Sequence, residues 1–135
     1  MTICTICEIT ANRVPAWIIY QDAAVICFLP RTLEAYGHTV IAPKTHYSNL
    51  FTTPDHLLEA VIKAAKKLAV HYKNQIGSSG VNILHASGAS AQQSVLHLHF
   101  HLIPRFDNDG VNAWPAFSAV QCDKDELLQK LQLRE

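Results

Sequence analysis

The chain has 135 residues, 49% of them hydrophobic, and its 11 basic residues balance 11 acidic ones. This length and composition predict one domain, residues 1–135, with enough apolar side chains to build a core. The even charge argues against a basic surface for duplex nucleic acid or for an anionic membrane, so we expect neither as a partner. Eight histidines, unevenly placed, are the unusual feature.

The first fifteen residues contain Glu8 and Arg13 and no long apolar run, unlike a signal peptide or a membrane span. We therefore expect a cytoplasmic protein. The four cysteines are Cys4, Cys7, Cys27 and Cys122. In that compartment they are expected to be thiols or metal ligands, not disulfides. Cys27 lies in an apolar run and is expected to be buried.

Five apolar runs are expected to be strands, and they span residues 17–20, 24–29, 38–42, 81–84 and 95–103. Gln21-Asp22 separates the first two runs and predicts a hairpin turn. Pro30, Pro43 and Pro104 are expected to end the second, third and fifth strands, because proline has no N–H to donate to a ladder.

One long helix is predicted to follow Thr53, the expected N-cap, with Pro54 at its first position. Apolar residues recur there at three- and four-residue spacing, and Gly77 is expected to end the helix. A short C-terminal helix is expected over residues 123–133. Strands with short connections and one inserted helix predict an α+β fold, with a mainly antiparallel five-stranded sheet.

The last predicted strand carries His97, His99 and His101 in strict alternation with apolar residues. The three imidazoles would share one face, in a row about 13 Å long at roughly 3.3 Å per residue. Zinc–nitrogen bonds are about 2.0–2.1 Å long, so the ligands of one zinc ion must converge on a single point. The outer two histidines of the row are too far apart for this, and the strand alone makes a poor three-histidine metal centre. A polyanion along the row fits better, because imidazole binds phosphate oxygens and is a nucleophile. A solvated polar face is the alternative.

The apolar residues between the histidines are expected to pack against the core, and they are Leu96, Leu98, Phe100 and Leu102. Near the amino end, Cys4-Thr5-Ile6-Cys7 forms a C-x-x-C pair. By itself this pair is open to three interpretations: a redox pair, half of a metal site, or chance. A thioredoxin-like site needs a surrounding βαβ unit, which the sequence does not supply.

The run from His97 to Ile103 matches the signature of the histidine-triad family, His-φ-His-φ-His-φ-φ with φ apolar, at every position. The segment from Gly37 to His46, GHTVIAPKTH, is similar to the family's strand leading into Pro-Lys-x-His. Gln93-Ser94-Val95 and Ile103-Pro104-Arg105 also resemble family segments. The resemblance extends from about Cys4 to Trp114.

The resemblance implies a nucleotide-binding hydrolase or transferase that acts on the α-phosphate of a phosphoramidate or a dinucleotide polyphosphate. His99 would attack the phosphorus to form a nucleotidyl-histidine intermediate, and His101 would assist the leaving group. Gln93 and Ser94 would position phosphate oxygens. An apolar bed for the base is expected from Ile6, Ile9, Phe28 and Leu29. The family also implies a homodimer. The alternative is a nucleotide-binding adaptor of the same fold with little turnover.

Family members with this C-x-x-C pair bind a metal through two further histidines, that of Pro-Lys-x-His and the first of the triad. The resemblance therefore implies a structural zinc ion held by Cys4, Cys7, His46 and His97. Two thiolates and two imidazoles form a closed tetrahedral set that suits zinc. His97 would then have a structural role and His99 a chemical one.

Three positions depart from the family pattern. Pro30 stands where an aspartate normally contacts the ribose hydroxyls, and Ala86 stands where an asparagine is usual. Gln92 replaces a common glycine. The phosphate-binding residues are therefore expected to be intact, while the nucleoside pocket is expected to be altered, with His85 as a possible substitute for the missing asparagine.

Overall fold

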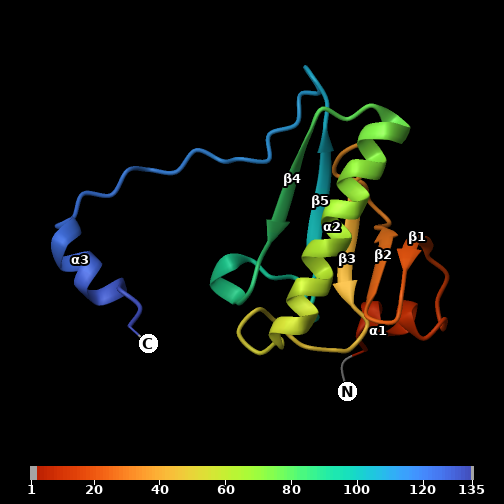
Figure 1. Ribbon diagram of the computed structural model, residues 1–135, viewed down its shortest axis with the longest axis horizontal. Coiled ribbons are helices and arrows are strands. Elements are labelled where there is room, and N and C mark those ends of the chain that lie inside the picture. Colours follow the sequence, from red (N-terminus) through yellow and green to blue (C-terminus); the bar gives the residue numbers. More distant parts are fainter. Residues whose placement is uncertain (1–2, 135) are drawn as a thin grey trace.

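The predicted hairpin forms because Asp22 organises its turn. The Asp22 carboxylate accepts hydrogen bonds from the backbone N–H groups of Ala24 and Val25, at 2.8 and 2.9 Å. Three further strands extend this hairpin into one antiparallel sheet (Figure 1). The order in the sheet is β1 (Trp17–Gln21), β2 (Val25–Leu29), β3 (Thr39–Pro43), β5 (Phe100–Arg105) and β4 (Gly80–His85). The expected α+β fold is confirmed.

The computed structural model describes residues 3–134. The helices are α1 Thr5–Thr10, α2 Asp55–Ile76 and α3 Lys124–Leu131, with a single 3₁₀ turn at Ala89–Ala91. Within the described residues, no helix is both long and apolar enough to cross a membrane.

The long helix α2 covers one face of the sheet. Its buried side chains pack against apolar residues of β2, β3 and β5, and the resulting core contains Val25, Cys27, Ile41, Val61, Ala64, Ala65, Leu68, Tyr72 and Leu102. Gly77 ends the helix in the left-handed conformation, at φ +75°, as predicted. Thr53 is not the N-cap; Pro54 is, and the Thr53 hydroxyl donates to the Asn49 carbonyl instead.

The opposite face of the sheet carries the short helix α1, which the sequence analysis did not predict. A second core cluster forms there from Ile6, Ile9, Ile26, Phe28, Val40 and Ala42. Cys4 is the N-cap of α1, and its sulfur accepts the backbone N–H of Cys7 at 3.4 Å. A helix of six residues is unstable alone, so this packing and the capping contact hold it in place.

The histidine segment is a strand over only part of its predicted length. β5 begins at Phe100, whereas residues 95–99 run outside the ladder. In that stretch the N–H of Leu98 donates to the Tyr47 carbonyl at 2.7 Å. Leu96, predicted to be in the core, is 64% exposed. The expected alternation of side chains between the two faces fails here, because a loop and not a neighbouring strand supplies the hydrogen-bond partner of this stretch.

One of the prolines lies inside a strand that it was expected to end. Pro43 is the last residue of β3, as expected, whereas Pro104 pairs with Val81 inside β5. A position whose N–H is not needed by the ladder accepts proline, and the strand then continues. Beyond Pro104, Arg105 completes β5.

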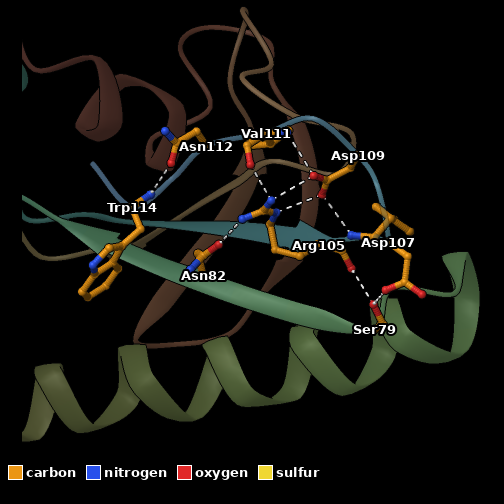
Figure 2. A network of polar contacts seen from close by, with 9 residues as sticks. Ser79, Asn82, Arg105, Asp107, Asp109, Val111, Asn112 and Trp114 are labelled. Carbon is orange, nitrogen blue, oxygen red and sulfur yellow. Dashed lines mark hydrogen bonds and ion pairs between the residues drawn. The ribbon is translucent and has the colours of Figure 1, made fainter. Parts of the chain in front are cut away.

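Arg105 fixes the turn that follows β5. Its guanidinium donates to both carboxylate oxygens of Asp109, at 2.9 Å each. Figure 2 shows these bonds together with those to the Asn82 side chain and the Val111 carbonyl. The hydrogen bond from Arg105 is the largest cause that holds the pKa of Asp109 far below its usual range. This network joins the turn to β4.

The chain after this network leaves the sheet and ends in α3, which lies apart from the rest of the molecule (Figure 1). Asp123 caps α3, accepting the N–H groups of Asp125 and Glu126. We call residues 114–134 the C-terminal arm. Its large exposed apolar residues are Trp114, Phe117, Val120, Leu127, Leu128, Leu131 and Leu133.

Candidate active site and metal centre

The three triad histidines divide between two sites. His97 is fully buried and turns toward α1, whereas His99 and His101 line a cavity. The Nε2 of His97 lies 2.8 Å from the Pro43 carbonyl. Because a carbonyl only accepts, Nε2 carries the proton and Nδ1 keeps a lone pair. That Nδ1 lies 3.3 Å from the Sγ of Cys4 and 3.6 Å from that of Cys7.

The four predicted zinc ligands come together around this lone pair. The ligand atoms of Cys4, Cys7, His46 and His97 all lie within 4.8 Å of one another. The Nδ1 of His46 is 3.1 Å from that of His97 and 3.4 Å from the Sγ of Cys7.

Tetrahedral zinc bonds of about 2.3 Å to sulfur and 2.0–2.1 Å to nitrogen imply edges of about 3.6 Å for S···N and about 3.3 Å for N···N. The separations around His97 match these edges closely. The spacing of Cys4 and Cys7 has a local cause as well: the first turn of α1 brings the two sulfurs to the same side of the chain. The donor set therefore fits a closed zinc site.

His99 has the opposite ring orientation. Its Nδ1 donates to the carbonyl of His97 at 2.7 Å, which leaves the lone pair on Nε2. Burial is the largest cause that lowers the pKa of His99 below its ordinary value, outweighing the bond to that carbonyl. At neutral pH the ring is therefore neutral. A neutral imidazole with a free Nε2 is a competent nucleophile.

His101 receives its orientation from His38, which the sequence analysis did not select. The backbone N–H of Glu34 donates to Nδ1 of His38 at 3.1 Å. The proton of neutral His38 is therefore on Nε2, which donates to Nδ1 of His101 at 2.9 Å. Neutral His101 must then carry its proton on Nε2, as a donor.

Burial lowers the pKa of both of these rings, and it lowers that of His101 to about 4, with His99 and His38 as the next causes. Both rings are therefore neutral at pH 7. The sheet register explains this contact, because His38 lies two residues before Val40, whose strand partner is His101. Alternation places His38 and Val40 on the same side of the chain.

His85 supports the backbone of His99. Its Nδ1 donates to the His99 carbonyl at 2.9 Å, and its Nε2 accepts from the hydroxyl of Ser87. That hydroxyl oxygen in turn accepts the N–H of Leu50 at 2.8 Å. The ring also stacks on Phe100, with centroids 4.3 Å apart. These contacts hold His85 in place, and it is not among the residues that line the cavity.

The cavity beside His99 and His101 has a volume of about 790 Å³. This is within the roughly 300–1,000 Å³ range of small-molecule sites. The predicted binding residues that line it are Ile6, Ile9, Phe28, Leu29 and Ser94. Further lining residues, which the sequence analysis did not select, include Val14, Pro15, Ala16, Trp17 and Arg31. The loop from 14 to 16, which precedes β1, has no periodic pattern that would have indicated its residues.

Gln93, predicted to hold phosphate oxygens, does not line this cavity. Its amide nitrogen donates to the carbonyls of Ser48 and Val95, at 2.6 and 3.0 Å, and its Oε1 accepts the N–H of Gly88. All of these partners are backbone groups. In this conformation Gln93 shapes the loop that positions Ser94.

A buried, neutral histidine pair lies beside an apolar cavity, next to a Cys₂His₂ cluster that could hold a metal ion. The family model described as "HIT domain" matches residues 11–108. The chain therefore belongs to the histidine-triad (HIT) family, a family of nucleotide-binding hydrolases.

Solved structures and a curated relative agree with this assignment. The fold is similar to that of a HIT family protein from Bacillus subtilis, 30% identical, with a TM-score of 0.85 and 99% of each chain covered. It is also similar to a zinc-bound histidine triad family protein from Mycobacterium smegmatis, 30% identical, with a TM-score of 0.78, over 82% of this chain and 80% of that one. An adenylylsulfatase from Arabidopsis thaliana is 32% identical, over 78% of this chain and 54% of the relative.

Proposed function

We propose that the protein transfers or hydrolyses the nucleotidyl group of a nucleotide conjugate, a phosphoramidate or a dinucleotide polyphosphate, through a covalent intermediate on His99. The observation that carries this proposal is the pairing of ring nitrogens at one cavity. His99 offers a lone pair on Nε2, and His101 offers an N–H on Nε2. A phosphate between them would meet a nucleophile and a hydrogen-bond donor at once.

In the first step, a bond forms between Nε2 of His99 and the α-phosphorus. The bond from phosphorus to the leaving group breaks, and the leaving group departs with its electron pair; an amine leaving group also takes up a proton from solvent. The Nε2–H of His101 donates a hydrogen bond to the leaving atom or to a phosphate oxygen, where charge develops. The positive charge that forms on the His99 ring is stabilised by the His97 carbonyl through Nδ1–H.

In the second step, water attacks the same phosphorus and its oxygen replaces Nε2. The bond to His99 breaks, a proton of that water passes to solvent, and the neutral ring is restored. The apolar bed of Ile6, Ile9 and Phe28 would hold the base meanwhile.

We propose further that Cys4, Cys7, His46 and His97 bind zinc. Bound there, zinc would supply a structural cross-link, because four protein ligands leave no open position for a substrate. The cross-link would join α1, the loop after β3 and the segment before β5. It would thereby hold the His97 carbonyl to which His99 donates.

Intact-mass spectrometry tests the central step. The protein is mixed briefly with adenosine 5′-phosphoramidate, quenched and weighed. We expect one adenylyl group per chain, placed on His99 by peptide mapping, and no adduct on a His99→Ala variant. The His56→Ala variant, which lacks an exposed histidine of α2, is the matched control and should form the adduct. Binding of AMP without an adduct or turnover would instead support the nucleotide-binding adaptor.

We propose that the protein is a homodimer in which a second copy covers the C-terminal arm. In support, α3 presents Leu127, Leu128 and Leu131 to solvent at the spacing of one helical face. Light scattering of the full chain should give a dimer mass, and Leu128→Asp combined with Leu131→Asp should shift it toward the monomer. A monomeric wild-type protein at micromolar concentration would contradict this proposal.

A further inference from the structure

The rim of the cavity carries one permanent charge, that of Arg31. Arg31 is the only lysine, arginine, aspartate or glutamate among the described residues that line the cavity. Most other lining residues are apolar, and the two histidines are neutral at pH 7. The cavity therefore combines an apolar bed, a phosphate-directed histidine pair and one separate cation.

Arg31 also differs from the other arginines of the chain. Arg13 pairs with Glu8, Arg105 pairs with Asp109, and Arg134 donates to a neighbouring side chain. Within residues 3–134, the Arg31 side chain has no hydrogen bond or ion pair, and it is exposed. A guanidinium with five donors is therefore available to a ligand in the cavity.

The sheet register sets how far this cation is from the reacting histidines. His101 pairs with Val40, and Val40 pairs with Phe28, so two strand spacings of about 4.8 Å, or about 10 Å, separate His101 from β2. Arg31 follows β2 by two residues. A nucleotide with its α-phosphate at the histidines and its base on Ile6 and Phe28 would place its ribose between these two ends. Arg31 would then approach the sugar, not the scissile bond.

At this end of the cavity, Pro30 and Leu29 offer no side-chain group that could read a ribose hydroxyl, whereas Arg31 suits an anion. Arginine forms forked, charge-assisted hydrogen bonds with phosphate. In dinucleotide-binding folds, likewise, an arginine binds a ribose 2′-phosphate at the place where a carboxylate would bind the free hydroxyl.

Resting on the function proposed above, we propose that the site prefers nucleotides with a second phosphate on the ribose, at the 2′ or the 3′ position. Arg31 is the residue that recognises this phosphate. The substrates would then be 5′-conjugates of a ribose-phosphorylated nucleotide. Arg31 is a specificity-determining residue in this scheme, and the bond-breaking step stays with His99 and His101.

Calorimetric titration of the intact protein tests the proposal with three probes that lack a leaving group: 5′-AMP, adenosine 2′,5′-bisphosphate and adenosine 3′,5′-bisphosphate. At least one bisphosphate should bind about tenfold more tightly than 5′-AMP, the gain typical of a charge-assisted hydrogen bond. Comparison of the two bisphosphates shows which hydroxyl carries the recognised phosphate.

The Arg31→Gln variant should lose this preference and keep its Kd for 5′-AMP within about twofold. Arg134→Gln removes the same charge from the C-terminal arm and should keep the full preference. Equal binding of all three probes by the wild type would overturn the inference while the proposed function stands. Equal weakening of all three by Arg31→Gln would also overturn it, since Arg31 would then contact the base or the α-phosphate. Failure of all three probes to bind would remove the proposed function and this inference together.

Discussion

His97 and His99 are two residues apart and lie in the same extended segment, yet each gives a different nitrogen to the backbone. His97 donates from Nε2 to the Pro43 carbonyl and turns its Nδ1 toward the cysteines. His99 donates from Nδ1 to the His97 carbonyl and turns its Nε2 toward the cavity. A carbonyl oxygen thus selects the tautomer of each ring, and the tautomer leaves one ring nitrogen free for the proposed metal ligand and the other free for the proposed nucleophile.

The largest effect is expected at His99, the proposed nucleophile. Replacement of His99 by alanine removes the Nε2 lone pair, so turnover of adenosine 5′-phosphoramidate should fall by at least about 10³-fold. The metal content and the thermal midpoint should change little, because His99 does not belong to the Cys₂His₂ cluster. Steady-state kinetics with elemental analysis of the same sample checks both. Turnover close to wild type would remove His99 from its proposed role.

Replacement of a cysteine of the Cys₂His₂ cluster should have the reverse effect, lowering the metal content and the thermal midpoint. Cys4→Ser weakens one of four zinc ligands, so the metal-to-protein ratio should fall well below one and the thermal midpoint should fall by about 10 °C. That fall corresponds to a loss of about 3 kcal/mol at roughly 4 °C per kcal/mol. Cys122→Ser changes an exposed cysteine outside the cluster and is the matched control. An unchanged metal ratio in Cys4→Ser would contradict the assignment.

A smaller effect is expected from pH. The pKa of His101 in the folded protein, about 4, lies below its ordinary value of 6.5. Between these values the unfolded chain binds more protons, so the free energy of unfolding should rise with pH, reach its full value above pH 6.5, and be lost as pH falls through 4. The change attributable to this group is at most ~3 kcal/mol.

Urea unfolding of the wild type and of His101→Gln, from pH 4 to pH 8, measures this linkage. The groups that face His101 are His38, His85 and His99, and they are present in both proteins. Acid release of metal is also common to both. The difference between the two unfolding free energies should therefore grow up to pH 6.5 and then level off. A difference that is constant over the whole range would show that His101 is not buried as a neutral ring.

The smallest effect concerns the sugar. Pro30 and Ala86 have no side-chain group for a ribose hydroxyl, and His85 is bound to the His99 carbonyl. A site without such a polar group leaves nothing unpaired when the hydroxyl is absent. The ribo and 2′-deoxy forms of one substrate should differ less than about tenfold in kcat/KM, or ~1.4 kcal/mol. Pro30→Asp with Ala86→Asn should widen this gap. A hundredfold preference in the wild type would show that another residue reads the sugar.

The sequence was informative where the residues of a motif lie close together along the chain. The C-x-x-C spacing and the family resemblance predicted the Cys₂His₂ cluster, and the apolar runs predicted the number of strands. It was less informative about the ring nitrogens, because the carbonyl of Pro43 is distant in sequence and reaches His97 only after β3 has folded. His38 was missed for the same reason, since its partner is 63 residues away.

The assignment of the ring protons can be measured directly by long-range ¹H–¹⁵N NMR of the histidine side chains in the metal-loaded protein at pH 7. We predict the proton on Nε2 for His97, on Nδ1 for His99 and on Nε2 for His101. The signals of each ring are assigned with a variant in which only that histidine is replaced. An Nε2 proton on His99 would contradict the account, because the nitrogen that faces the cavity would then have no lone pair with which to attack phosphorus.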